Sequence, residues 1–507
     1  MSTISRLFYR FSGETPSRRA IWCEGVALSY AEMANLVSRW ARGMALRGVR
    51  RGDHIAVLLP NNVEFVALLL VAADLGAVLV PLNTSLIPAA VLRAFEASAV
   101  QHVVGNAATL APLLESGLFA INDGNLWLSL DVVAEGVETL PDLIAGTPVD
   151  AQPLFAGRDD DPFILTMTSG STGDPKPIIL TQRTKINRAR AAQDLYNITD
   201  ADRTLAATPL YHSLAERLVL IPLLTGGTSI LMSRFSASEW LRVVGEQQVS
   251  FTIAVSSQLR QILGQIAVQG SRAMASLRCL VSSSAPLDSQ VKADLLARLH
   301  CDFHECYGAS EIAIASNLDS KSASLKMNSV GIAAPSVDIR ILTEDGDVAP
   351  VGQIGEIACK TPMIFGGYFE RPDMTAAAMW GDYFKTGDLG RLDEDGFLYF
   401  MGRQKEIIIS GGINVYPKDI EMAVSAFPSV AESAAFPIQD ERLGEVVGIA
   451  LVPEVGAAFD LKQLRRYCAQ QLADFQQPRK FFVLDKLPKN TMGKLMKHVL
   501  VEKYGKC

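Results

Sequence analysis

The sequence predicts an α/β protein with more than one domain. The chain has 507 residues, more than a single core usually organises, so two or more domains are expected. Short apolar runs rich in β-branched residues alternate with amphipathic stretches, which is typical of helices packed on largely parallel sheets. After Asp338 the pattern changes to short strands separated by glycines, which indicates a smaller β-rich part.

The N-terminal elements follow in regular alternation. Ser29 and Glu32 have the spacing of a capping box, and apolar residues then recur at helical intervals until Gly48. A buried strand is expected at residues 55–59, a helix at 64–75 and a strand at 77–82. The same alternation predicts further strands at 163–168, 228–232 and 277–282.

The second half of the chain divides into two parts. Strands at 337–342, 356–360 and 397–401 are expected to form the β-rich subdomain. Residues beyond Gly402 have strand and helix signals of their own, so we place a boundary at Arg403–Lys405. The expected architecture is an N-terminal domain over 1–403, with two layered α/β subdomains and the β-rich subdomain, and a small mobile α+β domain over 404–507.

Composition and charge narrow the function classes. The chain has 47 Lys and Arg against 54 Asp and Glu, a net charge of −7, and no dense basic block, which argues against nucleic acids and anionic membranes as partners. Residues 1–19 lack the apolar core of a signal peptide. Apolar runs such as 65–71 are too short to span a membrane. A cytoplasmic enzyme is expected.

The seven cysteines are irregularly spaced, which argues against a disulfide framework. His300, Cys301, His304 and Cys306 could be read as metal ligands. Residues 301–306 are a predicted strand, however, and alternate side chains of a strand face opposite ways. The pattern therefore favours buried cysteines in a core strand over a zinc site.

The strongest local motif is ThrMetThrSerGlySerThrGlyAspProLys at residues 166–176. Glycines behind a buried strand let backbone N–H groups converge on an anion, hydroxyls add neutral donors, and Lys176 adds a point charge. The candidate phosphate donors after the strand are Thr168, Ser169, Gly170, Ser171, Thr172 and Gly173. It is not a Walker A loop, because Pro175 precedes Lys176 and Pro177 follows it. A plain surface turn is the alternative, and five hydroxyls with a lysine disfavour it.

This loop resembles the signature of the adenylate-forming superfamily, which contains acyl-CoA synthetases, luciferases and the adenylation domains of peptide synthetases. The family usually has glycine where this chain has Pro177, and proline fixes φ and removes a donor. Further motifs follow in the family order, so that the resemblance covers roughly residues 20–500 of the chain. Each motif is short, and the ordered set makes the resemblance specific.

The resemblance implies a role for each motif. Tyr211 and His212 border the carboxylate pocket, and residues 281–287 pack on adenine through Ser284, Ala285 and Pro286. In the motif at 305–311, Tyr307 stacks on adenine and Glu311 holds Mg²⁺. The same segment contributes to nucleotide binding through Glu305, Gly308 and Ser310.

The later motifs complete the site that the resemblance implies. Asp388 binds the ribose, Arg403 touches ribose or phosphate, and Lys405 is the hinge of the C-terminal domain. Lys494 is the catalytic lysine. After a rotation of the domain, Gly411 and Gly412 face the tunnel of the acceptor thiol, where glycine allows a pantetheine arm to approach closely.

The implied reaction joins two anions. A carboxylate attacks the α-phosphorus of ATP, expels pyrophosphate and becomes an acyl-adenylate, and coenzyme A then takes the acyl group. Charge neutralisation is the main task, and it falls to Mg²⁺ held by Glu311, the hydroxyls that begin with Thr168, and Lys494, with His212 beside the acid. ATP, Mg²⁺ and coenzyme A are the expected cofactors and co-substrate.

The acid itself is less well specified. The expected pocket is small and weakly polar, and its wall comprises Tyr211, His212, Val255, Ser256, Ser282, Cys306, Ala309 and Ala313. Malonyl-type members of the family carry arginine where this chain has Cys306, and a thiol cannot pair a carboxylate. Arg217 is either a substitute or a helix-surface residue paired with Glu216 or a neighbour. A hydrophobic or cyclic monocarboxylate is expected.

Two alternatives stay open. An amine or a carrier-protein thiol could capture the acyl-adenylate in place of coenzyme A, because the activation motifs would be identical. The chain could also be a nucleotide-binding protein without catalysis, against which the presence of Glu311, Asp388 and Lys494 argues. A P-loop ATPase is excluded by the missing Gly-Lys-Ser/Thr.

Overall fold

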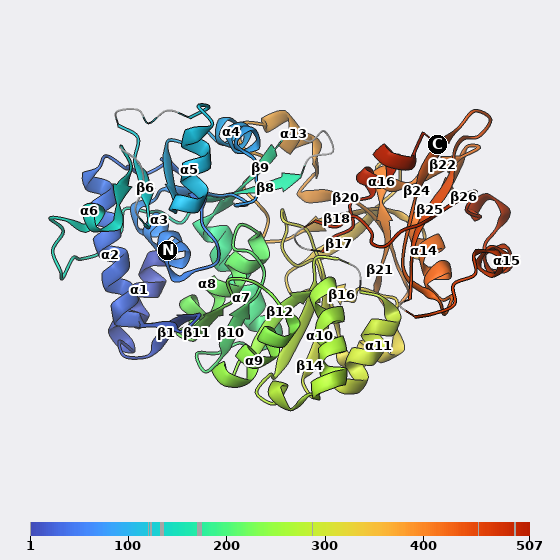
Figure 1. Cartoon of the computed structure of the whole chain (residues 1–507), viewed down its shortest axis with the longest axis horizontal. Coiled ribbons are helices and arrows are strands. Elements are labelled where there is room, and N and C mark those ends of the chain that lie inside the picture. The colour runs from blue at the N-terminus through green and yellow to red at the C-terminus, as the bar shows by residue number, and fades with distance from the viewer. Residues whose placement is uncertain are drawn as a thin grey trace.

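The computed structural model describes residues 2–119, 121, 124–131, 136–169, 175–285, 287–454, 456–490 and 493–506, with the backbone alone at 168–169. It has four sheets, two of them large and covered by helices (Figure 1). The mixed α/β architecture expected from the sequence is confirmed. Within these residues, no helix is both long and apolar enough to cross a membrane.

The first sheet has seven strands in the order β7-β6-β5-β3-β4-β8-β9. All neighbours pair in parallel except β8 and β9, which form an antiparallel pair around the phosphate loop. The strands are β3 (His54–Leu58), β4 (Val78–Pro81), β5 (His102–Gly105), β6 (Trp127–Ser129), β7 (Glu138–Thr139), β8 (Pro162–Ser169) and β9 (Pro175–Thr181). The accompanying helices are α1 (Ile4–Glu14), α2 (Tyr30–Leu46), α3 (Val63–Leu75), α4 (Pro88–Ala97), α5 (Ala107–Glu115) and α6 (Leu140–Ile144).

The second sheet has nine strands in the order β16-β15-β14-β13-β12-β10-β11-β1-β2. Its strands are β1 (Arg19–Cys23), β2 (Val26–Ser29), β10 (Arg203–Ala206), β11 (Thr228–Leu231), β12 (Phe251–Val255), β13 (Cys279–Ser283), β14 (Asp302–Tyr307), β15 (Ser316–Asp319) and β16 (Ile332–Ala333). Its helices are α7 (Gln182–Tyr196), α8 (Ser213–Thr225), α9 (Ala237–Gln247), α10 (Ser256–Gln269), α11 (Ser289–Arg298) and α12 (Ser320–Leu325). From β11 to β14 the pairing is parallel, so the carboxyl ends of these strands meet at one edge.

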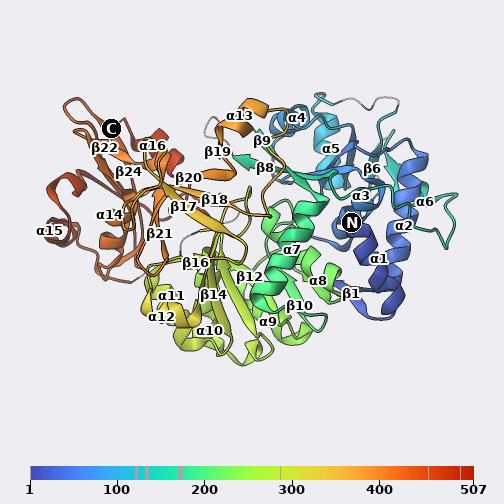
Figure 2. The same ribbon diagram turned by 180° about the vertical axis from the view of Figure 1, so that it is seen from behind.

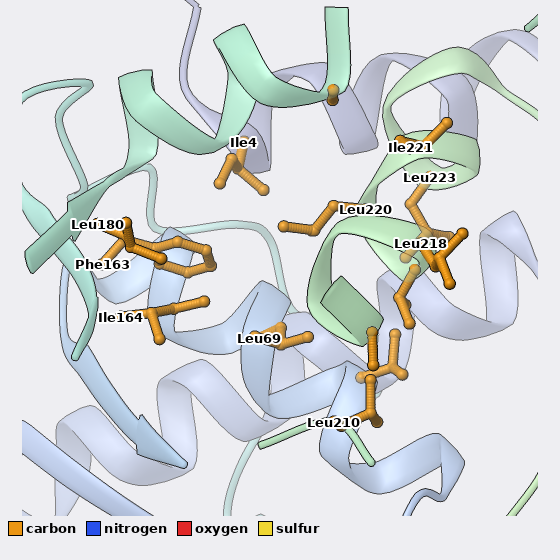
Figure 3. Close-up of a cluster of buried hydrophobic side chains, with 14 of the residues drawn as sticks. Ile4, Leu69, Phe163, Ile164, Leu180, Leu210, Leu218, Leu220, Ile221 and Leu223 are labelled. Carbon is orange, nitrogen blue, oxygen red and sulfur yellow. The ribbon is translucent and has the colours of Figure 1, made fainter. Parts of the chain in front are cut away.

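A continuous core joins the two sheets. Nearly every residue of α3 and α8 is buried, as expected for helices that are apolar all round. Figure 3 shows side chains of α1, α3, β8, β9 and α8 converging in this core. Ser29 and Glu32 form the capping box predicted at the start of α2.

The remaining two sheets follow in sequence, and Figures 1 and 2 place β17, β18, β20 and β21 between the large sheets and the C-terminal part. The third sheet is antiparallel and contains β17 (Asp338–Leu342), β18 (Gly355–Lys360), β19 (Met379–Trp380), β20 (Tyr383–Leu392) and β21 (Leu398–Arg403), with α13 (Pro372–Ala377) beside it. The fourth contains β22 (Ile408–Ser410), β23 (Ile413–Val415), β24 (Val430–Asp440), β25 (Gly444–Pro453) and β26 (Lys480–Val483).

The C-terminal part has helices α14 (Pro417–Ser425), α15 (Leu461–Gln471) and α16 (Lys497–Tyr504), and its two apolar clusters contain only residues beyond 407. A single turn of 3₁₀-helix, Gln404–Glu406, links it to β21. The division at 403/404 stays a prediction, and the cores and the link are compatible with it.

Candidate active site

The candidate site begins at the carboxyl end of β14. Tyr307 is buried there, its hydroxyl donates to Asp388 Oδ2 at 2.8 Å, and its ring centre lies 5.8 Å from that of Phe400. The next residue must be glycine, because a Cβ at Gly308 would lie 1.7 Å from the carbonyl oxygen of Ala313. Ala313 itself has a left-handed backbone, with φ of 61°, and such strain is often found at functional sites.

Asp388 on β20 connects the strand end to the link between the domains. Its side chain is buried, and Arg403 Nε lies 3.4 Å from its Oδ1. Burial raises the pKa of Asp388, while the charge of Arg403 and the hydroxyl of Tyr307 oppose that rise. The carboxylate therefore has a hydrogen-bond donor and a cation on different oxygens, as a group that also receives ribose hydroxyls would need.

Glu311 is held by both its backbone and its side chain. Tyr368 donates its hydroxyl to Glu311 Oε1 at 3.3 Å. Arg188 of α7 donates Nη2 to the carbonyl oxygens of Ser310 and Glu311, at 2.9 and 3.1 Å, and Nε to that of Met363 at 3.0 Å. Burial raises the pKa of Glu311, so a cation bound to this carboxylate would stabilise its charged form.

These residues fit a magnesium ion. Mg²⁺ usually takes one or two carboxylates and fills its other positions with phosphate oxygens and water. Within the described residues, no group of three or more His, Cys, Asp or Glu could enclose a metal. The donor set around Glu311 therefore suits an ion that arrives with a phosphate. It does not suit a site in which the protein supplies all the ligands. His300, Cys301, His304 and Cys306, which are all described, do not form such a site either.

The C-terminal loop brings Lys494 to the same place. The Lys494 N–H donates to Asn490 Oδ1 at 2.9 Å, and the side chain is part-buried near Arg403, Asp388 and Glu311. Burial and then Arg403 lower the pKa of Lys494, against the opposing pull of the carboxylates. The charges of Asp388 and Glu311, predicted to bind ribose and metal, thus act on the lysine predicted to be catalytic. Lys494 is more than a hundred residues away from either in the sequence.

The expected acid pocket is only partly assembled on one face. His212 is the N-cap residue of α8, and its ring centre lies 4.5 Å from that of Tyr211. Burial lowers the pKa of His212 to about 4. Val255 and Cys306 face the core shared with α8. Ser256 at the start of α10 donates its hydroxyl to the carbonyl oxygen of Ala285 at 2.7 Å. Ala309 is part-buried and packs against the shared core.

Two predicted site residues point to the opposite face of the sheet. Ser282 is in register with Ala254 and Glu305, and Ala254 belongs to the other apolar cluster. Glu305 forms an ion pair with Lys292 of α11, with Nζ and Oε2 2.5 Å apart. Alternate residues of a strand face opposite ways, so the structure does not bring Ser282 or Glu305 to the side of Val255 and Cys306.

Other predicted residues lie elsewhere or outside the described part. Ser284, exposed and with φ of 75°, follows β13. Lys176 pairs with Thr168 in the β8–β9 ladder. Lys405 is exposed in the link. Gly411 and Gly412 form the exposed turn between β22 and β23, and a Cβ at Gly412 would meet nothing within 4 Å. The described part does not include Gly170, Ser171, Thr172, Gly173 and Pro286, nor the side chains of Thr168 and Ser169.

The sequence carries no local signal for three residues that the structure adds to the site. Arg188 and Tyr368 hold the segment of Glu311. Ser257 contacts the loop of Lys494, because a Cβ at Gly493 would lie 2.0 Å from Ser257 Oγ. Each comes from an element distant in the sequence from the group it supports, so no motif spacing could reveal it.

Comparison with known proteins gives a consistent result. The profile described as AMP-binding enzyme matches residues 8–369, and that described as AMP-binding enzyme C-terminal domain matches residues 419–494. The chain is 32% identical to a feruloyl-CoA synthase of Amycolatopsis sp over 496 residues, 97% of each chain.

Solved structures are similar over nearly the whole length. The o-succinylbenzoate CoA synthetase of Bacillus subtilis, in complex with its acyl-adenylate intermediate, has a TM-score of 0.85 and 28% identity, over 99% of each chain. An amide bond synthetase of Marinactinospora thermotolerans has a TM-score of 0.88 and 25% identity, also over 99% of each.

Proposed function

The chain belongs to the AMP-binding enzyme family, and from this premise we propose how its own residues carry out the reaction. It is an AMP-forming acid–CoA ligase, which activates a carboxylic acid with ATP as an acyl-adenylate, releases pyrophosphate and transfers the acyl group to coenzyme A. The observation that supports the residue roles best is that Lys494 is near enough to Asp388 and Glu311 for the charges of both carboxylates to act on it.

Tyr307 and Asp388 position the nucleoside. The ring of Tyr307 offers a flat face for adenine at the end of β14, and its hydroxyl fixes one oxygen of Asp388. The other oxygen, beside Arg403, accepts from the ribose. Gly308 lets the backbone of Ala313 pack directly against the end of β14, since no side chain fits there.

Lys494 neutralises charge as the acid carboxylate meets the α-phosphate. A cation at this place acts in a part-buried site where it is worth more than in water. By analogy with other donors to a developing charge, its loss costs about 2.7–4 kcal/mol, or roughly 10²–10³ in rate. His212 stays neutral because of its lowered pKa, so it can border the acid without competing with Lys494 for the carboxylate.

Glu311 would hold the magnesium ion, which would supply positive charge to the phosphates when bound. Tyr368 donates to this carboxylate, and Arg188 holds the backbone of the same residue through its carbonyl oxygen, so two other segments of the chain position Glu311. The phosphate loop, residues 168–176, contributes its hydroxyls and Lys176 to the same charge, as the sequence predicts.

The acceptor step requires another arrangement of the C-terminal domain. The Gly411–Gly412 turn lies exposed while Lys494 occupies the site. Rotation about the link at Lys405 would withdraw Lys494 and present the turn, in which glycine leaves room for a thin thiol arm. Relatives named as CoA ligases support coenzyme A as the acceptor, whereas the amide bond synthetase supports an amine as the second candidate. A carrier-protein thiol would use the same turn.

The acid has an apolar or cyclic body. Val255 and Ala309, which are predicted to line the acid pocket, are small and apolar and belong to or pack against the same core. Such side chains suit a substrate of medium size. Relatives are named for ferulate and indoleacetate, both aromatic acids, which supports this class.

A pyrophosphate-release screen over carboxylic acids, with ATP and Mg²⁺, tests the proposal. We expect acid-dependent release, a thioester when coenzyme A is added, and neither in Lys494→Ala. Lys489→Ala in the same loop, which removes an ion pair with Glu432, should retain activity. ATP binding without any acid-dependent release would instead indicate a protein that has lost catalysis. Parallel reactions with amines or a carrier protein identify the acceptor.

A further inference from the structure

Arg217 on α8 is a buried cation without a counter-ion in the described part of the chain. Its residue exposure is 7%, and Nε is fully buried without a hydrogen-bond partner. Among the described residues, no carboxylate oxygen lies within 4.0 Å of its guanidinium. An isolated buried charge is strongly unfavourable, so a protein that retains one has a use for it.

The neighbouring charges do not neutralise Arg217. Glu216, which precedes Arg217 in α8, forms an ion pair with Lys185 of α7, with Nζ and Oε2 2.6 Å apart. Both side chains are at most 1% exposed. Arg188 is satisfied by neutral acceptors, three main-chain carbonyls and the hydroxyl of Ser213. Three cations between α7 and α8 therefore have two carboxylates near them, because the charge of Glu311 also acts on Arg188. The remaining positive charge favours an anion that comes from outside.

Arg217 lies near β14, the strand that ends at Tyr307, which is predicted to stack on adenine. Its charge acts on Cys306 and on Tyr196 at the end of α7, and Cys306 directly precedes Tyr307 in β14. The thiol cannot serve as the counter-ion, because burial raises its pKa. Arg217 also lies on α8, the helix that follows directly after His212, the residue predicted to border the acid.

We propose that Arg217 determines acid specificity by binding a second anionic oxygen group of the acid, at the end remote from the carboxylate that is activated. The planar guanidinium is suited to a carboxylate or a similar oxyanion, which it can bind with two parallel hydrogen bonds. The proposal rests on the proposed function and deepens it. It replaces a simple hydrophobic monocarboxylate with an acid that has an apolar or cyclic body and an anionic group at each end.

Matched pairs of acids test this inference. Cyclohexanecarboxylate and cyclohexane-1,4-dicarboxylate, or 3-phenylpropionate and its 4-carboxy derivative, differ only in the second carboxylate. For the wild type we expect kcat/KM in pyrophosphate release to be at least about 10-fold higher for a dicarboxylate, since each tenfold is about 1.4 kcal/mol. In Arg217→Met the preference should reverse. Arg217→Lys keeps the positive charge but lacks the planar guanidinium, so it should retain part of the preference for the dicarboxylate.

Thermal unfolding separates this role from a structural one. If the role of Arg217 is to bind a ligand, Arg217→Met removes an unpaired buried charge from the substrate-free protein. The Tm of this variant without substrate should then equal or exceed that of the wild type. A dicarboxylate should raise the Tm of the wild type and not that of the variant. Arg190→Met, at an exposed position of α7, is the control and should change neither specificity nor Tm.

Three results would overturn the inference. A rise in the KM for ATP in Arg217→Met, equal for all acids, would assign the residue to the phosphates. A lower Tm with unchanged specificity would show that its role is structural. Equal use of both acids by wild type and variant would show that the second anion is not bound. Absence of acid-dependent release from the wild type with any acid would instead contradict the proposed function.

Discussion

Gly493 and Ser257 are in such close contact that no other residue fits at position 493. An added Cβ would lie 2.0 Å from Ser257 Oγ and 2.5 Å from Ser257 Cβ, and Gly493 has φ of 71°, which disfavours a side chain in any case. The contact joins the loop of Lys494 to the first turn of α10, one residue from Ser256. It therefore fixes the position of the loop that carries Lys494, the residue that we propose to be catalytic in the first half-reaction.

Gly493→Ala should disable adenylation without removing any group that takes part in it. Because a side chain at 493 pushes the loop away from Ser257, Lys494 would be misplaced, and a displacement of about 1 Å can cost roughly 10²-fold in rate. Acid-dependent ATP–pyrophosphate exchange measures this loss. Thioester formation from a synthetic acyl-adenylate and coenzyme A should be nearly unchanged, because that step does not need the docked loop.

Two further variants make this test specific. Gly264→Ala lies on the same helix and meets no atom within 4 Å, so exchange should stay at the level of the wild type. Ser257→Gly combined with Gly493→Ala restores space and should recover part of the activity. An equal loss in both half-reactions would show that the substitution damages the fold instead of the docking.

Asp388→Asn should weaken ATP binding more than Tyr307→Phe does. The asparagine removes the charge from the hydrogen bonds that we assign to the ribose, and such charged bonds contribute about 1.5–3 kcal/mol each, so the KM for ATP should rise roughly 10- to 150-fold. The phenylalanine keeps the ring for adenine and loses only the hydroxyl that now donates to Asp388, which predicts a rise of about 2- to 10-fold. The reverse order would contradict the assignment of Asp388 to the ribose.

Adenylation should decline at alkaline pH earlier than an exposed lysine would allow. Lys494 must carry its proton to neutralise the phosphate, and burial together with Arg403 lowers its pKa, so the proton is lost at a lower pH than usual. Rate–pH profiles of pyrophosphate exchange measure the pH at which the rate declines on the alkaline side, which we call the alkaline limb. Lys494→Arg keeps its charge throughout, so its slower reaction should lack the limb, and an unchanged limb in that variant would assign the titration to another group.

His212 should make the protein less stable as pH falls from about 6.5 toward 4. Burial lowers the pKa of His212 to about 4 in the folded state, against an ordinary value of about 6.5. Between these values the unfolded chain binds the proton and the folded chain does not, so stability falls with decreasing pH, by at most about 1.4 kcal/mol per unit. Above about 6.5 the effect vanishes.

Tm measured at several pH values tests this linkage. The difference in Tm between the wild type and His212→Gln should shift in favour of the variant as pH falls through this window. A difference that stays constant with pH would show that His212 retains an ordinary pKa.

Much of the fold follows from local sequence patterns. The capping box of Ser29 and Glu32, the buried strands and the change of pattern after Asp338 all depend on residues within a few positions of one another, and the structure has each of them. Element ends were less accurate: the strand expected at 277–282 runs from Cys279 to Ser283. The end of such a strand depends on where the neighbouring strands of the sheet begin and end. The sequence of the strand itself does not contain this information.

The site divides in the same way. The sequence by itself determined the order of the motifs, and from that order it predicts that Glu311, Asp388 and Lys494 serve one reaction. Only the tertiary structure decided that Ser282 faces away from Cys306, and that Arg217 is buried without a counter-ion. Motifs are formed by residues that are close in the sequence, so they can be recognised without a structure. Burial, the face of a sheet to which a side chain points and the balance of charges depend on which distant segments pack together.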